Sequence, residues 1–370
     1  MISLPSAQVL IVHEESPGVT TAWHSAPPNS LESEILLLSS SEFLDVEVPK
    51  RLMEVIVGID KLARKLNKPA ITIGNFDGVH WGHRVLFDKV KDWANRLQGQ
   101  SVVMTFHPHP IEVLAPGNGP RFITRHQRKL ELIAASGIDA AIVVPFSREF
   151  AAISARDFVQ SILVERVGVK AVIVGHDYRF GRNREGDIEF LRRLGDELGF
   201  TVEMVSGIQM DGMVVSSTVI RRLIQDGDLE EANKLLGRLY EISGTVVPGR
   251  QRGGRLLGFP TANIRMNDQV PPKPGVYVVE VELDGMTYGG AANLGYNPTF
   301  GGTDLSLEVH ILDFSQDIYG TAITIKFIAR LRDERRFSGP EALIEQIHQD
   351  VAAARELLAR WAASAATASS

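Results

Sequence analysis

The chain has 370 residues, a net charge of −6 and no cysteine, and 44% of its residues are hydrophobic. This length favours two domains, and the composition is that of a soluble globular protein. Without cysteine, disulfides, thiolate zinc sites and cysteine nucleophiles are excluded. No apolar run reaches the ~20 residues of a membrane span, and no Lys/Arg cluster points to nucleic acid. The N-terminus lacks the pattern of a signal peptide, so we expect a cytoplasmic protein.

Residues 1–54 form an extension of unknown role, with one candidate strand at Val9–Val12 and a linker-like segment rich in Ser and Pro from Ser16 to Ser41. From Val55 onward, short apolar runs alternate with amphipathic segments, which predicts a doubly wound parallel sheet that binds ligands outside the carboxyl ends of its strands. The expected strands are Ala70–Gly74, Ser101–Phe106, Ala140–Pro145, Ala171–Gly175 and Thr201–Val205, and the expected helices are Gly82–Leu97, Arg125–Ser136, Ala155–Val167 and Asp187–Leu198.

Two short helices, Ser217–Gln225 and Leu229–Leu236, precede a different pattern. Closely spaced Gly and Pro residues over 240–330 predict an antiparallel barrel or sandwich, followed by a terminal helix at Pro340–Ala362 and a disordered tail at 363–370. The expected strands are Val276–Leu283, Tyr288–Asn293, Leu305–Phe314 and Ala322–Ala329.

A turn with two glycines and two histidines, residues 75–83 (NFDGVHWGH), joins the first expected strand of the sheet to a helix. Such a turn exposes backbone N–H groups at the positive end of the helix, which favours phosphate. Gly78 permits the tight turn, and Gly82 allows backbone to approach a ligand closely. His80 and His83 are three residues apart, so both can face one anion. The motif therefore predicts a phosphate site.

A zinc site is the alternative for these histidines. His107 and His109 also follow a strand, and together with His80 and His83 they could hold the metal. The two prolines among residues 106–110 indicate a rigid strand-end loop instead, so we favour the phosphate site.

Two further strand ends carry polar residues. The segment Gly175–Gly181 contains Asp177 and Arg179 where a doubly wound sheet places its ligands, although an ion pair in a turn would give the same pattern. Ser216 to Thr218 open a helix that carries Arg221, and a plain helix N-cap is the simpler interpretation of these hydroxyls.

In the β-rich half, the glycine loop Gly249–Arg255 contains three arginines that could wrap a triphosphate, or it could be an exposed hairpin turn. The sequence has no Walker-type phosphate loop. Thr261 and Asn263 follow, and they offer hard oxygen ligands suited to Mg²⁺.

Glu308 lies in an alternating strand that places Leu307 and Val309 on one face and Glu308 on the other. Alternation alone favours a solvated glutamate.

Residues 74–83 resemble the HxGH motif of the adenylyltransferase superfamily. With residues 175–181 and 216–221, the chain is similar to prokaryotic bifunctional riboflavin kinase/FAD synthetases. The resemblance implies that His80 and His83 contact ATP phosphates, that Arg221 closes over them, and that the FMN phosphate attacks the α-phosphorus directly, without a general base. The implied nucleotide-binding residues are Gly74, Phe76, Asp77, Gly78, Ser217, Thr218 and Asp177, the last one near the flavin nucleotide and its Mg²⁺.

Residues 258–263 and 293–300 resemble the riboflavin kinase domain. The resemblance implies that Glu308 is the base that accepts the proton of the ribityl 5′-hydroxyl, and that Thr261 and Asn263 hold Mg²⁺. The other implied binding residues are Arg250, Arg255, Gly258, Pro260 and Asn293.

The resemblance therefore implies two ATP-dependent reactions. A riboflavin kinase domain (238–362) phosphorylates riboflavin to FMN, and an adenylyltransferase domain (55–237) converts FMN to FAD. We expect small molecules as the partners, no nucleic acid or membrane, and a monomer or weak homo-oligomer. Three rival hypotheses are a nucleotidyltransferase for another phosphate-bearing substrate, a flavin-binding protein without turnover, and an enzyme in which one activity survives.

Overall fold

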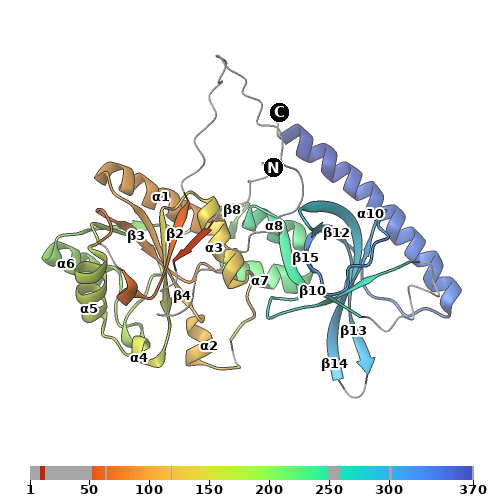
Figure 1. Cartoon of the computed structure of the whole chain (residues 1–370), viewed down its shortest axis with the longest axis horizontal. Coiled ribbons are helices and arrows are strands. Elements are labelled where there is room, and N and C mark those ends of the chain that lie inside the picture. The colour runs from red at the N-terminus through yellow and green to blue at the C-terminus, as the bar shows by residue number, and fades with distance from the viewer. Residues whose placement is uncertain are drawn as a thin grey trace, which may run out of the picture.

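The computed structural model describes residues 9–12, 52–62, 65–117, 119–248, 259–299 and 302–368. They form two parts, a parallel sheet surrounded by helices and a β-barrel flanked by one long helix (Figure 1). Helices α7 (Ser217–Asp226) and α8 (Leu229–Leu236) lie between the sheet and the barrel.

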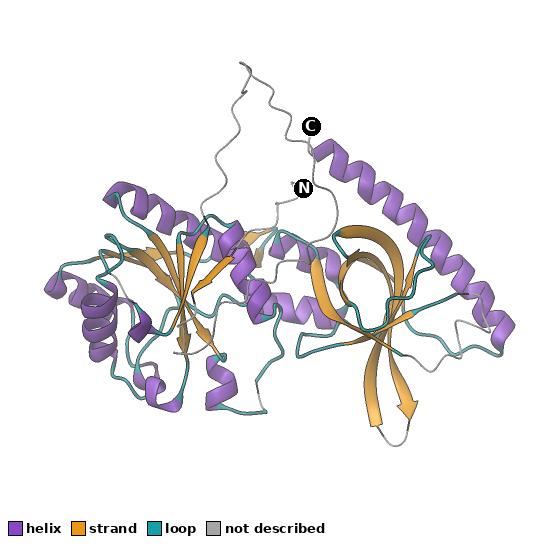
Figure 2. Cartoon of the chain, viewed as in Figure 1, coloured by secondary structure: helices purple, strands orange, loops and turns teal. Residues whose placement is uncertain are grey.

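Seven strands form the sheet in the order β1-β2-β5-β4-β3-β6-β7, and each pair is parallel. All four residues of β3 are buried, as expected where helices cover both faces (Figure 2). Ile71 and Met104 belong to the hydrophobic cluster on one face, and Ala70 and Val103 to that on the other. The strands are β1 (Val9–Val12), β2 (Met53–Val57), β3 (Ala70–Ile73), β4 (Ser101–His107), β5 (Ala140–Pro145), β6 (Ala171–Gly175) and β7 (Thr201–Val205).

The helices of this part pack on both faces, so the predicted doubly wound sheet is confirmed. Phe87 of α1 and Ile133 of α3 cover one face, while Leu163 of η2 and Leu191 of α6 cover the other. The helix expected over 155–167 is mostly π-helical. The helical segments are η1 (Ile59–Lys61), α1 (Trp81–Leu97), α2 (Pro110–Leu114), α3 (His126–Ala135), α4 (Arg148–Ala151), α5 (Ala155–Asp157), η2 (Phe158–Val167), η3 (Arg182–Arg184) and α6 (Ile188–Leu198).

The candidate strand Val9–Val12 is confirmed as β1, which pairs in parallel with β2 at the edge of the sheet. The predicted boundary of the extension, at residue 54, falls inside β2, so the extension contributes one strand and part of another to the sheet. A short hairpin of β8 (Gln209–Met210) and β9 (Met213–Val214) follows the sheet.

The second part is a closed barrel in the order β10-β11-β14-β13-β12-β15, with antiparallel neighbours. Its interior holds alternate strand residues such as Leu307, Val309 and Phe327, all fully buried. Of the two architectures left open by the sequence, the barrel is the one observed. Its strands are β10 (Tyr240–Val247), β11 (Ala262–Arg265), β12 (Gly275–Leu283), β13 (Met286–Thr299), β14 (Gly302–Ile311) and β15 (Ala322–Arg332).

The apolar side chains of α7 and α8 pack with the barrel. Ile220, Ile224 and Leu235 belong to the same hydrophobic cluster as Tyr240 and Phe327 of the barrel. The two helices, which the sequence analysis places before the predicted boundary at residue 237, thus share a hydrophobic cluster with the barrel.

The terminal helix, α10 (Pro340–Ala368), runs along the outside of the barrel (Figure 1). Residues 363–370 were expected to be a disordered tail, but the helix continues to Ala368, because Ala is the strongest helix former and the segment contains neither Gly nor Pro.

Candidate active sites

The turn between β3 and α1 contains three residues with positive φ, and one of them is the glycine for which the sequence predicts this conformation. Gly78 has a φ of +89°, and Phe76 and Val79 also have positive φ values, 51° and 42°. His80 is the N-cap residue of α1. A Cβ at Gly82 would lie 3.1 Å from the His80 ring and 3.3 Å from the carbonyl oxygen of Val215, so this glycine leaves room for both.

The rings of His80 and His83 stack on each other, with centroids 3.6 Å apart. His80 is buried and His83 is half-buried, and the Nδ1 atom of each is buried without a hydrogen-bond partner. Burial, aided by the nearby positive charge of Arg238, lowers the pKa of His80 to about 3. Burial also places the pKa of His83 well below its ordinary value. Both imidazoles are therefore neutral near pH 7, and they offer hydrogen bonds without a full charge.

Asp77 ties three segments together. Its buried carboxylate accepts hydrogen bonds from the backbone N–H groups of Ile123 and Thr124, at 3.0–3.1 Å, and pairs with Arg221 at 2.7 Å. The Ser217 hydroxyl donates to the Asp77 carbonyl oxygen at 2.8 Å. Residues expected to meet a nucleotide thus hold one another in this structure.

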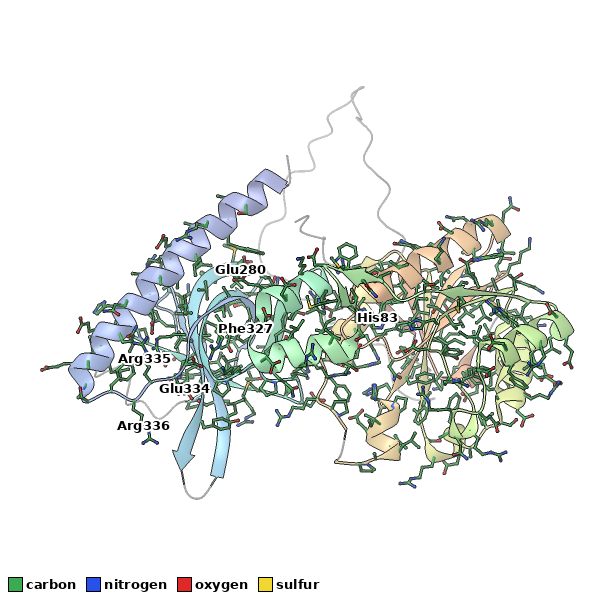
Figure 3. The ribbon with its side chains drawn as sticks, turned by 180° about the vertical axis from the view of Figure 1, so that it is seen from behind. His83, Glu280, Phe327, Glu334, Arg335 and Arg336 are labelled. Atoms are coloured by element: carbon green, nitrogen blue, oxygen red, sulfur yellow. The ribbon has the colours of Figure 1, made fainter. Side chains whose placement is uncertain are left out.

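A cavity of about 730 Å³ opens beside this turn and lies between the two parts of the chain. His80 and His83 do not line it, although Asp77 does. Figure 3 labels His83 near the middle of the molecule. The walls include Asn75, Asp77 and His107 from the sheet part, and Glu241, Ser243 and Thr324 from the barrel.

Residues 121–124, which we call the strap, connect the turn to the barrel. On one side the strap meets the Asp77 carboxylate. On the other, Phe122 donates its N–H to the carbonyl of Asp268 and accepts from the N–H of Val270. Arg128 of α3 adds an ion pair with Glu241 of β10 at 2.6 Å. The geometry of the turn therefore depends on the barrel.

The two histidines of residues 106–110 (FHPHP) each have a partner nearby. His107 stacks on His126 with centroids 4.1 Å apart, and the Nδ1 atom of His109 accepts from the N–H of Ile111 and caps α2. Over the described ranges, no group of three or more His, Asp or Glu side chains has the arrangement of a metal site.

The remaining residues expected at the first site lie apart from the cavity. Phe76 is buried against His83 and Phe87, and a Cβ at Gly74 would touch its ring. Asp177 is exposed after β6, and Thr218 is exposed in the first turn of α7.

The second site is a row of polar residues on the outer face of the barrel. In the strand register Glu308 of β14 lies directly opposite Asn263 of β11 and opposite Asn293 of β13. Such neighbours have Cβ atoms about 5 Å apart. Thr261 precedes Asn263 by two residues, so sequence alternation and register bring the expected base and metal ligands together.

A cavity of about 390 Å³ lies between this face and α10. Thr261, Asn293 and Glu308 line it, and Glu334 and Arg335, labelled in Figure 3, close it on the far side of the barrel from His83. Arg332 and Asp350 support the wall through a buried ion pair at 2.6 Å.

Of the other expected residues at this site, the Pro260 carbonyl accepts a hydrogen bond from the His310 ring at 2.8 Å. Arg250, Arg255 and Gly258 lie outside the described residues.

Sequence reasoning missed Lys129 and Arg238. Lys129 lines the large cavity, and Arg238 is half-buried at the junction, with its Nε and one Nη atom buried and unpartnered. A signal for the lysine was present in the sequence. Lys129 precedes the apolar Ile133 by four residues, and this spacing places the lysine on the buried face of α3. Arg238 gave no such signal, because it lies between α8 and β10 and belongs to no periodic pattern.

Comparison with known proteins gives two family matches, FAD synthetase over residues 62–219 and riboflavin kinase over residues 236–358. The chain is 39% identical to a bifunctional riboflavin kinase/FMN adenylyltransferase of Pseudomonas fluorescens, covering 83% of this chain and 98% of that protein. It is 40% identical to the protein of the same name from Escherichia coli K12, covering 82% and 97%.

A crystal structure described as a macrolide-efflux protein from Streptococcus pneumoniae has the same fold, with a TM-score of 0.74 and 32% identity over 81% of this chain and 98% of that one. In the part of this chain that the structure describes, no helix has both the length and the apolar character needed to cross a bilayer.

Proposed function

Because this chain belongs to the bifunctional riboflavin kinase/FMN adenylyltransferase family, we propose that its two reactions take place at the two cavities described above. The enzyme phosphorylates riboflavin to FMN and adenylylates FMN to FAD, with ATP as co-substrate in both steps. The observation that carries the assignment is the strand register, which supports one row of base and ligand side chains at the barrel cavity.

At the barrel cavity, Glu308 accepts the proton from the ribityl 5′-hydroxyl while that oxygen attacks the γ-phosphorus of ATP and ADP leaves. The reaction needs a base because an alcohol is a poor nucleophile. Asn293 and Pro260 bind substrate beside it, and Arg250, Arg255 and Gly258 are proposed to contact ATP.

Thr261 and Asn263 fit a magnesium site. Their hard side-chain oxygens stand two residues apart beside the register row, and Thr261 lines the cavity. Mg²⁺ held there with the ATP phosphates would neutralise part of their charge.

At the large cavity, FMN lies with its phosphate toward the turn that holds Asp77. The volume falls within the range of about 300–1,000 Å³ typical of small-molecule sites. A phosphate oxygen of FMN forms a bond to the α-phosphorus of ATP, and the bond to pyrophosphate breaks. No base is needed, since the nucleophile is already an anion.

His80 and His83 donate hydrogen bonds to the ATP phosphates in this step, and Arg221 with Ser217 and Thr218 closes over them. The unpartnered Nδ1 atoms of the two histidines support this role. A buried polar atom without a partner costs free energy, and a hydrogen bond to a phosphate would remove that cost. Gly74, Phe76 and Gly78 shape the turn. The family resemblance implies that Asp177 lies near the flavin nucleotide and its Mg²⁺, but Asp177 does not line the large cavity and has no role in this placement of FMN. Neither ring lines the large cavity, so the surroundings of the two histidines must rearrange before ATP can contact them.

The remaining proposals concern the setting of the enzyme. We expect a cytoplasmic location, where ATP is supplied, a monomer or weak homo-oligomer, and no nucleic-acid or membrane partner.

The metal assignment is tested with Asn263→Ala in an assay that resolves FMN and FAD by chromatography while Mg²⁺ is titrated. The Mg²⁺ concentration for half-maximal riboflavin phosphorylation should rise about tenfold or more, the range for loss of one supporting ligand group, while adenylylation of supplied FMN keeps its Mg²⁺ dependence. Arg265→Ala, exposed two residues along the same strand, is the control. An unchanged dependence of the kinase step would contradict the assignment.

A further inference from the structure

Lys129 of α3 is a buried cation that faces the large cavity. Its relative exposure is 6%, and it is one of the residues that line the cavity. The ammonium group donates hydrogen bonds to the carbonyl oxygen of Asn75 and the hydroxyl of Thr105, both at 3.1 Å. Both acceptors are neutral, and a lysine has three N–H donors, so one remains for another group.

The position of Lys129 matches that of a ligand-binding residue in a parallel sheet. Asn75 follows β3 and Thr105 lies near the end of β4, and these two strands are neighbours. Their carboxyl ends lie at the edge where open α/β sheets bind ligands. Lys129 also lies close enough to His83 for its charge to contribute to the lowered pKa of that ring.

The carboxylates near Lys129 are engaged elsewhere. Asp77 accepts from Arg221 and from two backbone N–H groups of the strap, and Glu112 accepts from the N–H of His109 at 2.7 Å. Burial is the main influence on Lys129, and it lowers the pKa of the ammonium to about 8, which leaves it mostly charged near pH 7. A buried charge held by neutral groups is costly, and such groups are concentrated at functional sites.

Arg128, the other basic residue of α3, differs in this respect. Arg128, the residue before Lys129, is paired with both Glu131 and Glu241. Its charge therefore supports the junction between the two parts, whereas that of Lys129 is directed to the cavity.

We propose that Lys129 binds the phosphate of FMN in the large cavity and thereby selects FMN over riboflavin as the substrate for adenylylation. The inference rests on the proposed function, because it takes this cavity as the flavin-nucleotide site. The two flavins differ only in the phosphate, so a residue that binds it separates the product of the first reaction from its substrate.

The test is the steady-state kinetics of FAD formation from supplied FMN by Lys129→Met, which keeps the length of the side chain and removes its charge. The KM for FMN should rise about 10- to 100-fold, as expected for loss of one charge-assisted hydrogen bond. The kcat value and the KM for ATP should change little, because the contact exists before and during the reaction. Lys129→Arg should recover part of the affinity. Lys91→Met, on the outer face of α1 where Lys91 pairs with Asp88, is the control.

Riboflavin phosphorylation by the same variants reports on folding, since it depends on the barrel cavity. If Lys129→Met keeps the wild-type KM for FMN, or raises the KM for ATP instead, Lys129 does not bind the FMN phosphate. If it lowers kcat with an unchanged KM and a lower unfolding temperature, its role is structural. If the wild-type enzyme makes FAD but substitutions of residues that line the large cavity leave FAD formation unchanged, the large cavity is not the FMN site.

Discussion

The two candidate sites differ in how the chain places its polar side chains. Around the first, Asp77 of the turn binds Ser217 and Arg221 of α7, a helix far away in the sequence. At the second, Asn263, Glu308 and Asn293 lie side by side because their strands are in register. A β-ladder fixes neighbours by backbone pairing alone. A loop site depends instead on tertiary contacts, here including those of another domain. The first arrangement should thus be sensitive to distant changes, and the second to changes within the row.

The largest effect is expected from Glu308→Ala. Removing the base should lower the rate of riboflavin phosphorylation by about 10²–10⁴-fold. Adenylylation of supplied FMN should stay at the wild-type rate, because the first site lies elsewhere. Glu345→Ala, exposed on α10 and not lining the cavity, is the matched control. Equal loss of both steps would mean that the two sites are not separate.

His83→Ala provides the reverse case. Loss of one hydrogen-bond donor to the charge that develops in the transition state should slow FAD formation by about 10²–10³-fold, while FMN still accumulates from riboflavin. The exposed His176 supplies the control substitution, His176→Ala. Chromatography of the products reads both steps at once, and full FAD production by His83→Ala would remove the histidine from the proposed mechanism.

Asp77→Asn tests whether the first site depends on its internal contacts. Removing the charge leaves the buried guanidinium of Arg221 without its partner, which should lower the free energy of unfolding by about 3–5 kcal/mol. Urea denaturation measures this value. In the control, Asp313→Asn breaks the exposed pair with Arg355 and should cost no more than about 1 kcal/mol. Similar small losses of stability in both variants would contradict a stabilising role for the buried contacts of Asp77.

The smallest effect concerns pH. Burial lowers the pKa of His80 and of His126 to about 3, below the unfolded value near 6.5. The unfolded chain therefore binds more protons between these values, and stability should fall as the pH drops from about 6.5 toward 3. His126→Asn should flatten this dependence and His176→Asn should not. Denaturation midpoints at several pH values between 7 and 4.5 would show it, and identical slopes would refute it.

Much of the fold could be predicted because its signals are local. Continuous apolar runs such as Ala140–Pro145 mark buried parallel strands, and alternation around Glu308 gives its face and its neighbours. The HxGH turn could also be located, since Gly78 needs a positive φ. The engagement of Asp77 by the strap could not be predicted, because residues 121–124 are more than forty positions away and have no pattern of their own. The packing of α7 and α8 with the barrel depends on partner surfaces that periodicity does not identify.

The large cavity has walls from both halves of the chain, and this limits how the protein can be divided or recombined. A fragment that ends at residue 237 would keep Arg128 but lose Glu241. The large cavity would then open to solvent on the side that the barrel now covers. If the large cavity is the FMN site, we expect exchange of the barrel for that of a distant relative to alter FAD synthesis even with every residue of the nucleotide motif retained. Dividing the chain at this point would therefore expose the proposed FMN site as well as separate the two parts.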